Sequence, residues 1–164
     1  MAKHIQLQFV DRILIQRADR LGDVVLSCPV IESLKYHRPE LKIDVLTSPI
    51  GAKFLEGHPL ISNLYIIDMN SDDKHNELNS LVETLTENRY DVYISLWNTP
   101  KLARLGRRCG IKYRIGDATD WLLKQTYTHA VDQEWTDFSC HQIHFNLKLL
   151  RPFGIVDQGP LRRV

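Results

Sequence analysis

Short apolar runs alternate with helix-like patterns along this chain. Residues 12–16 predict a buried strand, and residues 22–37 predict a helix because their apolar side chains recur at helical spacing. Pro29 lies inside this helix and should kink it. We expect further strands at residues 41–46, 63–67, 90–96 and 113–115, and further helices at residues 51–56, 76–88, 100–108 and 142–150. Residues 117–138 have no legible periodicity.

Alternating strands and helices with short connections predict an α/β fold. We expect a Rossmann-like, doubly wound and mainly parallel sheet, covered by helices on both faces. Residues 1–155 should form this one domain, and residues 156–164 a tail or the start of an interdomain connection. Ligands of such sheets bind beyond the carboxyl ends of the strands. That rule selects five segments, at residues 17–23, 47–51, 68–73, 97–101 and 116–120.

The composition excludes several classes of protein. The chain has 43% hydrophobic and 25% charged residues and a formal net charge of +1, so nothing draws it globally to nucleic acid. Three cysteines without a C-x-x-C spacing disfavour a disulfide framework or a zinc site and favour a reducing cytoplasm. No apolar run is long enough for a signal peptide or a membrane span. We expect a cytoplasmic protein whose contact with a membrane, if any, is peripheral at its inner face.

The loop after the first predicted strand, residues 17–23, holds the first candidate chemistry. It is neither a G-x-G-x-x-G fingerprint nor a P-loop, which disfavours a dinucleotide site. Gly22 allows a substrate to approach the backbone. Asp23, at the start of the helix, suits either a general base or a helix cap. Asp19 and Arg20 suit either a binding site or a solvated surface pair.

A second candidate follows the fourth predicted strand. Residues 99–114 carry six positive charges and no acid. Lys101 and Arg104 lie one helical turn apart and could hold an anionic acceptor, although a solvated helix face has the same pattern. Asn98 is a candidate polar contact in the crevice. Trp97 suits stacking on a sugar or packing in the core.

Other polar groups predict less. The acidic residues 68–73 read most simply as a solvated loop. His141 and His144 are three residues apart, but no third ligand accompanies them, so we expect no metal site. Nucleic-acid binding is disfavoured because aromatic residues do not interleave with the basic residues of the segment 99–114.

The order of these segments matches a known family. Residues 13–17 (Ile-Leu-Ile-Gln-Arg) are followed by residues 21–26 (Leu-Gly-Asp-Val-Val-Leu) and by Pro29. This series resembles the opening of the ADP-heptose:lipopolysaccharide heptosyltransferases. Weaker matches continue in order at residues 39–46, 51, 58–61, 90–94, 113–116 and 141–155.

The resemblance implies a function that the pattern alone does not. The family has the GT-B fold of two Rossmann-like domains, and it transfers heptose from an ADP-sugar to a lipopolysaccharide-core acceptor with inversion and generally without a metal or cofactor. The aspartate of its Gly-Asp pair is taken as the base, and that role carries over to Asp23. The acceptor would be held on the side formed by seven residues: Arg17, Asp19, Arg20, Gly22, Asn98, Lys101 and Arg104. The family often has small hydroxyl residues where this chain has Asp19 and Arg20.

Family members are about twice as long as this chain. The resemblance therefore implies the N-terminal, acceptor-side domain, with the ADP-sugar bound by a second domain and with the isolated chain inactive. One alternative is a non-catalytic acceptor-binding module or the remnant of a truncated gene. Another is a GT-B transferase that uses a different sugar.

Overall fold

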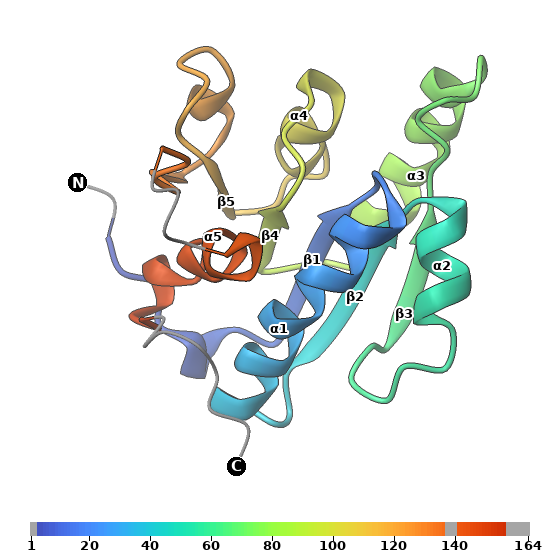
Figure 1. Cartoon of the computed structure of the whole chain (residues 1–164). Coiled ribbons are helices and arrows are strands. Elements are labelled where there is room, and N and C mark those ends of the chain that lie inside the picture. The colour runs from blue at the N-terminus through green and yellow to red at the C-terminus, as the bar shows by residue number, and fades with distance from the viewer. Residues whose placement is uncertain (1–2, 137–140, 157–164) are drawn as a thin grey trace.

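The computed structural model describes residues 3–136 and 141–156, and these residues form one six-stranded parallel sheet (Figure 1). Its strands are β1 (Arg12–Arg17), β2 (Lys42–Thr47), β3 (Asn63–Ile66), β4 (Val92–Ser95), β5 (Tyr113–Asp117) and β6 (His129–Val131). The helices are α1 (Leu21–His37), α2 (Pro49–Leu55), α3 (Lys74–Glu87), α4 (Pro100–Arg108) and α5 (Gln142–Lys148). The order β3-β2-β1-β4-β5-β6 with only parallel pairs is that of a Rossmann-like sheet, so the predicted fold class is confirmed.

The pleat of the central strands divides the core into two layers. Side chains alternate between the faces of a strand, so Ile13 and Ile15 of β1 pack on one side and Leu14 packs on the other. The first layer is filled from α1 and α5, and the second from α3 and α4. Both faces of β1 are therefore buried, which explains its continuous apolar run.

Four short elements have no counterpart in the sequence pattern. The segment without periodicity contains β6 and a 3-10 helix, η2 (Leu123–Thr126). Two further 3-10 turns, η1 (Leu7–Phe9) and η3 (Arg151–Phe153), flank the domain. Elements of three or four residues are too short for either hydrophobic period to repeat. Residues 157–164, which were expected to start a connection or tail, lie outside the described residues.

The two ends of the described chain meet at the amino-end edge of the sheet. The Ile5 backbone N–H donates to the Pro152 carbonyl oxygen at 2.8 Å. The His4 ring packs against Gly154, whose φ of +75° suits glycine. Ile5 is 2% exposed and belongs to the same core layer as Phe153. The N-terminal segment is thus part of the fold.

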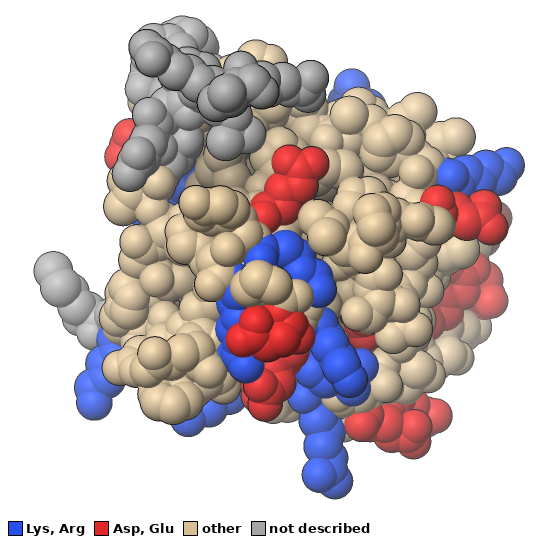
Figure 2. Space-filling model, turned by 90° about the horizontal axis from the view of Figure 1, so that it is seen from below, with Lys and Arg blue, Asp and Glu red and all other residues tan. Residues whose placement is uncertain are grey.

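The surface around this end has a mixed charge. Figure 2, viewed from the end where α1 finishes, shows basic side chains interspersed with acidic ones. Arg38, which directly follows α1, pairs with Asp11 at 3.0 Å and with Glu40 at 3.4 Å. Within the described part of the chain, no helix is long and apolar enough to cross a membrane.

Two glycines give a matched test of this packing. A Cβ at Gly106 in α4 would lie 2.4 Å from Cδ1 of the fully buried Tyr93, whereas one at Gly22 in α1 would meet nothing within 4 Å. Gly106→Ala should lower the free energy of unfolding by about 1–3 kcal/mol, the usual cost of overpacking. Gly22→Ala should leave it unchanged or raise it, because alanine favours helix. Urea unfolding checks both, and equal stability of the two variants would contradict this packing.

Candidate functional site

A cavity of about 590 Å³ lies where the sheet topology predicts a ligand site. The strand order reverses between β1 and β4, and the cavity opens beyond the carboxyl ends of the strands around that point. Four of the five segments selected from the sequence contribute to it. Its lining is Ala18, Asp19, Arg20, Asp23, Ser48, Pro49, Ile50, Asp68, Met69, Asn70 and Trp97.

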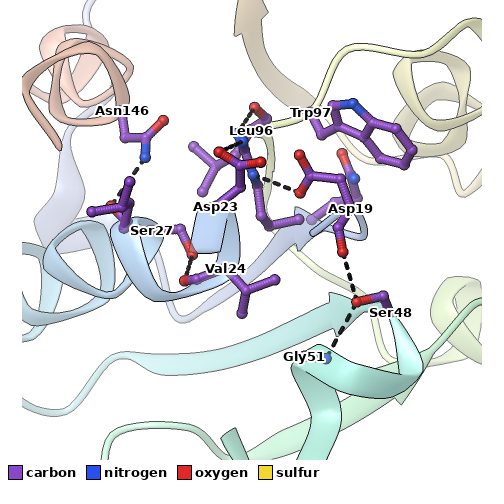
Figure 3. A network of polar contacts seen from close by, with 12 residues as sticks. Asp19, Asp23, Val24, Ser27, Ser48, Gly51, Leu96, Trp97 and Asn146 are labelled. Atoms are coloured by element: carbon purple, nitrogen blue, oxygen red, sulfur yellow. Dashed lines mark hydrogen bonds and ion pairs between the residues drawn. The ribbon is translucent and has the colours of Figure 1, made fainter. Parts of the chain in front are cut away.

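Arg17, the last residue of β1, organises the wall of this cavity. Its side chain is only 7% exposed, and its guanidinium meets three partners. Nη1 donates to the Leu96 carbonyl oxygen at 2.5 Å, Nη2 lies 3.2 Å from Asp23 Oδ1, and Nε lies 2.9 Å from Asp19 Oδ1. Figure 3 shows the two carboxylates side by side at the start of α1. Arg17 therefore balances the charge of the Asp19 and Asp23 carboxylates and holds them in place from the buried side of the cavity wall. Its predicted contact with an acceptor stays a prediction.

Asp23 lies in the first turn of α1, but it does not cap the helix. The N-cap residue is Arg20, and no side chain makes a capping hydrogen bond there. The Asp23 carboxylate turns instead to Arg17 and remains 31% exposed toward the cavity. The helix-cap interpretation of Asp23 is thus wrong. The position of its carboxylate at the cavity suits the alternative interpretation, a general base that accepts a proton.

Asp19 occupies a more confined position than Asp23. Its side chain is 11% exposed, and its contact with Arg17 Nε is an ion pair without hydrogen-bond geometry. Burial raises the pKa of Asp19, the nearby Asp23 charge raises it further, and Arg17 opposes both effects. Asp19 therefore binds a proton more readily than an ordinary aspartate does.

Buried polar contacts hold the loops of the cavity together. Ser48 Oγ donates to the Asp19 carbonyl oxygen at 2.9 Å and accepts from the Gly51 N–H at 3.3 Å, which caps α2 (Figure 3). The buried Gln16 amide satisfies its neighbours when its nitrogen faces the Trp97 carbonyl oxygen and its oxygen faces the Ala18 N–H. The β1 and β4 loops are thereby joined by Gln16, and the β1 and β2 loops by Ser48.

The remaining predicted residues lie around the cavity rather than in it. Gly22 is exposed and has open space beside it, as close approach of a ligand requires. Asn98 Oδ1 accepts from the Tyr127 hydroxyl at 2.5 Å. Burial raises the pKa of Tyr127 to about 12, so this hydroxyl stays a donor near neutral pH. Lys101 and Arg104 are exposed on α4 and do not line the cavity, and their role stays a prediction.

The described residues contain no cluster of three or more side chains suited to a metal ion. His141 has a structural role, because its Nδ1 accepts from the Ile143 N–H at the start of α5. Trp97 joins the cavity wall and is half-buried, next to Asp19 in Figure 3.

A larger cavity, of about 790 Å³, lies at the opposite end of the strands. Its wall comes from the N-terminal segment and from residues that precede β4, β5 and β6. Asp91, one of its acids, is committed to structure, because its Oδ2 accepts the backbone N–H groups of Asp11 and Arg12 at 2.8 and 3.0 Å. The smaller cavity is the better candidate, because Asp19 and Asp23, two of the three carboxylates in its wall, retain partial exposure at the end of the sheet where ligands bind.

Comparison with known proteins identifies relatives of this chain. No family model matches it. Lipopolysaccharide heptosyltransferase 3 of Escherichia coli strain K12 is 34% identical over 143 residues, which cover 83% of this chain and 40% of that protein. The resemblance to the heptosyltransferases is confirmed. The chain spans about two-fifths of the length of the curated relatives that it matches.

Solved structures give the same fold for heptosyltransferase-like proteins. A glycosyl transferase family 9 protein from Veillonella parvula has a TM-score of 0.80 at 20% identity, covering 94% of this chain and 44% of its own. E. coli heptosyltransferase WaaC with ADP-2-deoxy-2-fluoro heptose has a TM-score of 0.74 at 18% identity, covering 91% and 50%. These likenesses show the fold of one part of such proteins.

Sequence reasoning missed several residues of this candidate site. Ser48, Met69 and Asn70 carried no separate signal beyond lying in segments at strand ends. Asp68 belonged to a stretch that was read as a solvated loop, yet it lines the cavity. The partner of Arg17, the Leu96 carbonyl oxygen, is a backbone group 79 residues away and leaves no mark in the sequence.

The raised pKa of Asp19 gives a pH-dependent prediction. Because its pKa is higher in the folded chain, the folded state binds more protons than the unfolded state between the ordinary value of 3.8 and the folded value. Stability from this group is therefore present below 3.8 and lost as the pH rises through the folded pKa. Asp19→Asn should raise the free energy of unfolding at pH 7, and the gain should shrink as the pH falls toward 3.8.

Urea unfolding across this pH range measures the effect. Asp72→Asn is the matched control, since Asp72 is an exposed acid outside the cavity, and it should show no such trend. An Asp19→Asn variant that is less stable than the parent chain at pH 7 would mean that ionised Asp19 is net stabilising.

Proposed function

We propose that this chain is the acceptor-side part of a glycosyltransferase that moves a heptose-like sugar from an ADP-sugar to a lipopolysaccharide-core acceptor. The observation that carries the proposal is the Asp23 carboxylate, oriented by Arg17 and partly exposed in the 590 Å³ cavity. Its sequence context in a chain 34% identical to a lipopolysaccharide heptosyltransferase supports the sugar class.

Asp23 is the general base of the proposed reaction. The acceptor hydroxyl gives its proton to the Asp23 carboxylate while its oxygen bonds to the anomeric carbon of the donor. The bond from that carbon to the ADP oxygen breaks, and ADP leaves with the electron pair. Attack from the face opposite ADP inverts the anomeric centre. Arg17 holds the Asp23 carboxylate in place beside the cavity, because its Nη2 lies 3.2 Å from Asp23 Oδ1.

The two substrates need different electrostatic surroundings. Arg20 lines the cavity, and Lys101 and Arg104 lie exposed on α4, where they would bind phosphate or carboxylate groups of an acidic acceptor. The cavity itself is lined by three carboxylates, Asp19, Asp23 and Asp68, which disfavour a diphosphate. We therefore assign the ADP group to a part of the protein beyond this chain. We propose no metal or other cofactor for this chain.

Replacement of Asp23 tests the chemistry. In the natural full-length protein, Asp23→Asn should lower turnover about 10²–10⁴-fold, the usual worth of a general base. Stability should change little, because Asn keeps an oxygen that can face Arg17 and no helix cap is lost. Turnover with ADP-heptose and a core acceptor, together with the melting temperature, gives the readout.

Asp72→Asn, outside the cavity, is the control for that assay and should retain full turnover. Near-normal turnover of the Asp23→Asn variant would overturn the assignment of the base. It would favour the alternative of a non-catalytic acceptor-binding module if acceptor binding survived.

The acidity of the cavity predicts weak nucleotide binding by the 164-residue chain. Calorimetry with ADP and with ADP-heptose should give no dissociation constant tighter than the millimolar range, about −4 kcal/mol. Repulsion between the diphosphate and three carboxylates is the reason. A low-micromolar dissociation constant would show that this chain holds the donor itself.

A further inference from the structure

Two adjacent large apolar side chains project from the segment between β5 and β6. Trp121 is 66% exposed and Leu122 is 61% exposed. Two other exposed apolar pairs, Leu21 with Val25 on α1 and Ile50 with Phe54 on α2, lie one helical turn apart, but each of their side chains is less than half exposed. Single exposed apolar side chains are ordinary, whereas an adjacent tryptophan and leucine form a contiguous apolar surface.

The fold presents these two side chains on an ordered turn. Asp120 Oδ1 accepts the backbone N–H groups of Leu122 and Leu123 at 2.9 and 3.1 Å. Leu123, next in the chain, packs with Ala103 of α4 and with Tyr127. The turn is thus held on α4 by Leu123, and its hydrogen bonds to Asp120 leave the Trp121 and Leu122 side chains exposed.

Basic residues adjoin this apolar pair. α4 packs against η2 and buries its apolar side chains Leu102 and Leu105. After Pro100, its exposed residues are all cations: Lys101, Arg104, Arg107 and Arg108. Lys124 adds an exposed cation within η2 itself. Of these, only Arg108 makes a side-chain hydrogen bond among the described residues, to Asn79 Oδ1 at 2.6 Å. Figure 1 shows α4 and the β5–β6 segment projecting from the same end of the sheet.

The acids near this surface are already engaged. Asp120 accepts two backbone N–H groups, as described, and Asp117 is buried, accepting from Thr119 Oγ1 at 2.9 Å and from Trp135 Nε1 at 3.2 Å. The surface therefore combines an apolar tip with a surplus of free positive charge.

We infer that Trp121, Leu122 and the cations of α4 and η2 form a docking surface for an anionic lipid bilayer. Tryptophan and leucine favour the membrane–water interface, and a cluster of lysine and arginine is attracted to lipid phosphates. A nucleic acid or a protein would match the charge but would not need the Trp-Leu tip. The surface lies at the same end of the sheet as the cavity, so docking would hold Asp23 near the lipid headgroups.

Vesicle binding tests the inference without any sugar substrate, so its result is independent of the proposed function. The 164-residue chain should sediment with vesicles of equal parts phosphatidylglycerol and phosphatidylcholine, but not with phosphatidylcholine alone. Arg107→Glu with Lys124→Glu should weaken binding at least about 25-fold, roughly fivefold for each cation removed. The matched control, Lys42→Glu with Lys53→Glu, changes the same charge at exposed sites elsewhere and should weaken it less than fivefold.

The apolar tip needs its own readout. Trp121→Ala with Leu122→Ala should weaken vesicle binding at least tenfold, whereas Tyr36→Ala, which removes an 84% exposed aromatic from α1, should not. Tryptophan emission should shift to the blue on addition of anionic vesicles, and the shift should be lost in Trp121→Phe.

Two results would overturn the docking surface. One is the absence of sedimentation with anionic vesicles by a chain whose circular dichroism shows it folded. The other is binding that salt abolishes but the Trp121 and Leu122 changes leave intact, which would indicate a charged surface for another partner.

Discussion

The buried guanidinium of Arg17 is the interaction on which the candidate site depends. From the end of β1, it binds Asp19 in the loop before α1, Asp23 in the first turn of α1 and the Leu96 carbonyl oxygen just after β4. Without it, two neighbouring carboxylates would repel each other, and a buried carbonyl would lose its donor. Such buried ion pairs contribute little net stability, but removing one partner leaves the others uncompensated. Arg17 therefore fixes a geometry rather than strengthening the fold.

The distribution of charge separates two tasks that the net charge of +1 conceals. The cavity is acidic, with three carboxylates and Arg20 in its wall, and it suits proton transfer. The free cations lie outside it on α4 and η2, and they suit recognition of anions. A base works better when it is not neutralised by the groups that bind an anionic substrate, so this separation serves both tasks.

The sequence could predict what depends on local pattern. The apolar runs predicted five strands, and four of the five segments selected by the topological rule line the cavity. The pattern could not predict β6, because three residues show no period. It could not choose between cap and base for Asp23, because that choice depends on where the Arg17 side chain lies. For the same reason the sequence predicted that Arg17 binds an anion of the acceptor, whereas the structure shows its side chain buried in the cavity wall.

Charged residues were the least predictable part of the site. Lys101 and Arg104 have the same helical spacing whether they bind an acceptor or face water, and the structure shows only that they are exposed. The heptosyltransferase resemblance came from the order of many weak matches, which a pattern of charges could not provide. Homology and geometry therefore support different parts of the argument, the sugar class and the proton transfer respectively.

The hydrogen bond between Ile5 and Pro152 has a consequence for how the protein is made. Ile5 leaves the ribosome early, but its partner is synthesised roughly 7–30 s later at a usual 5–20 residues per second. During that interval the Ile5 side chain has no Phe153 to pack against, and the core layer around α1 is open at one edge. This core layer can therefore close only after residues 152 and 153 have been synthesised, and Ile5 lacks these partners until then.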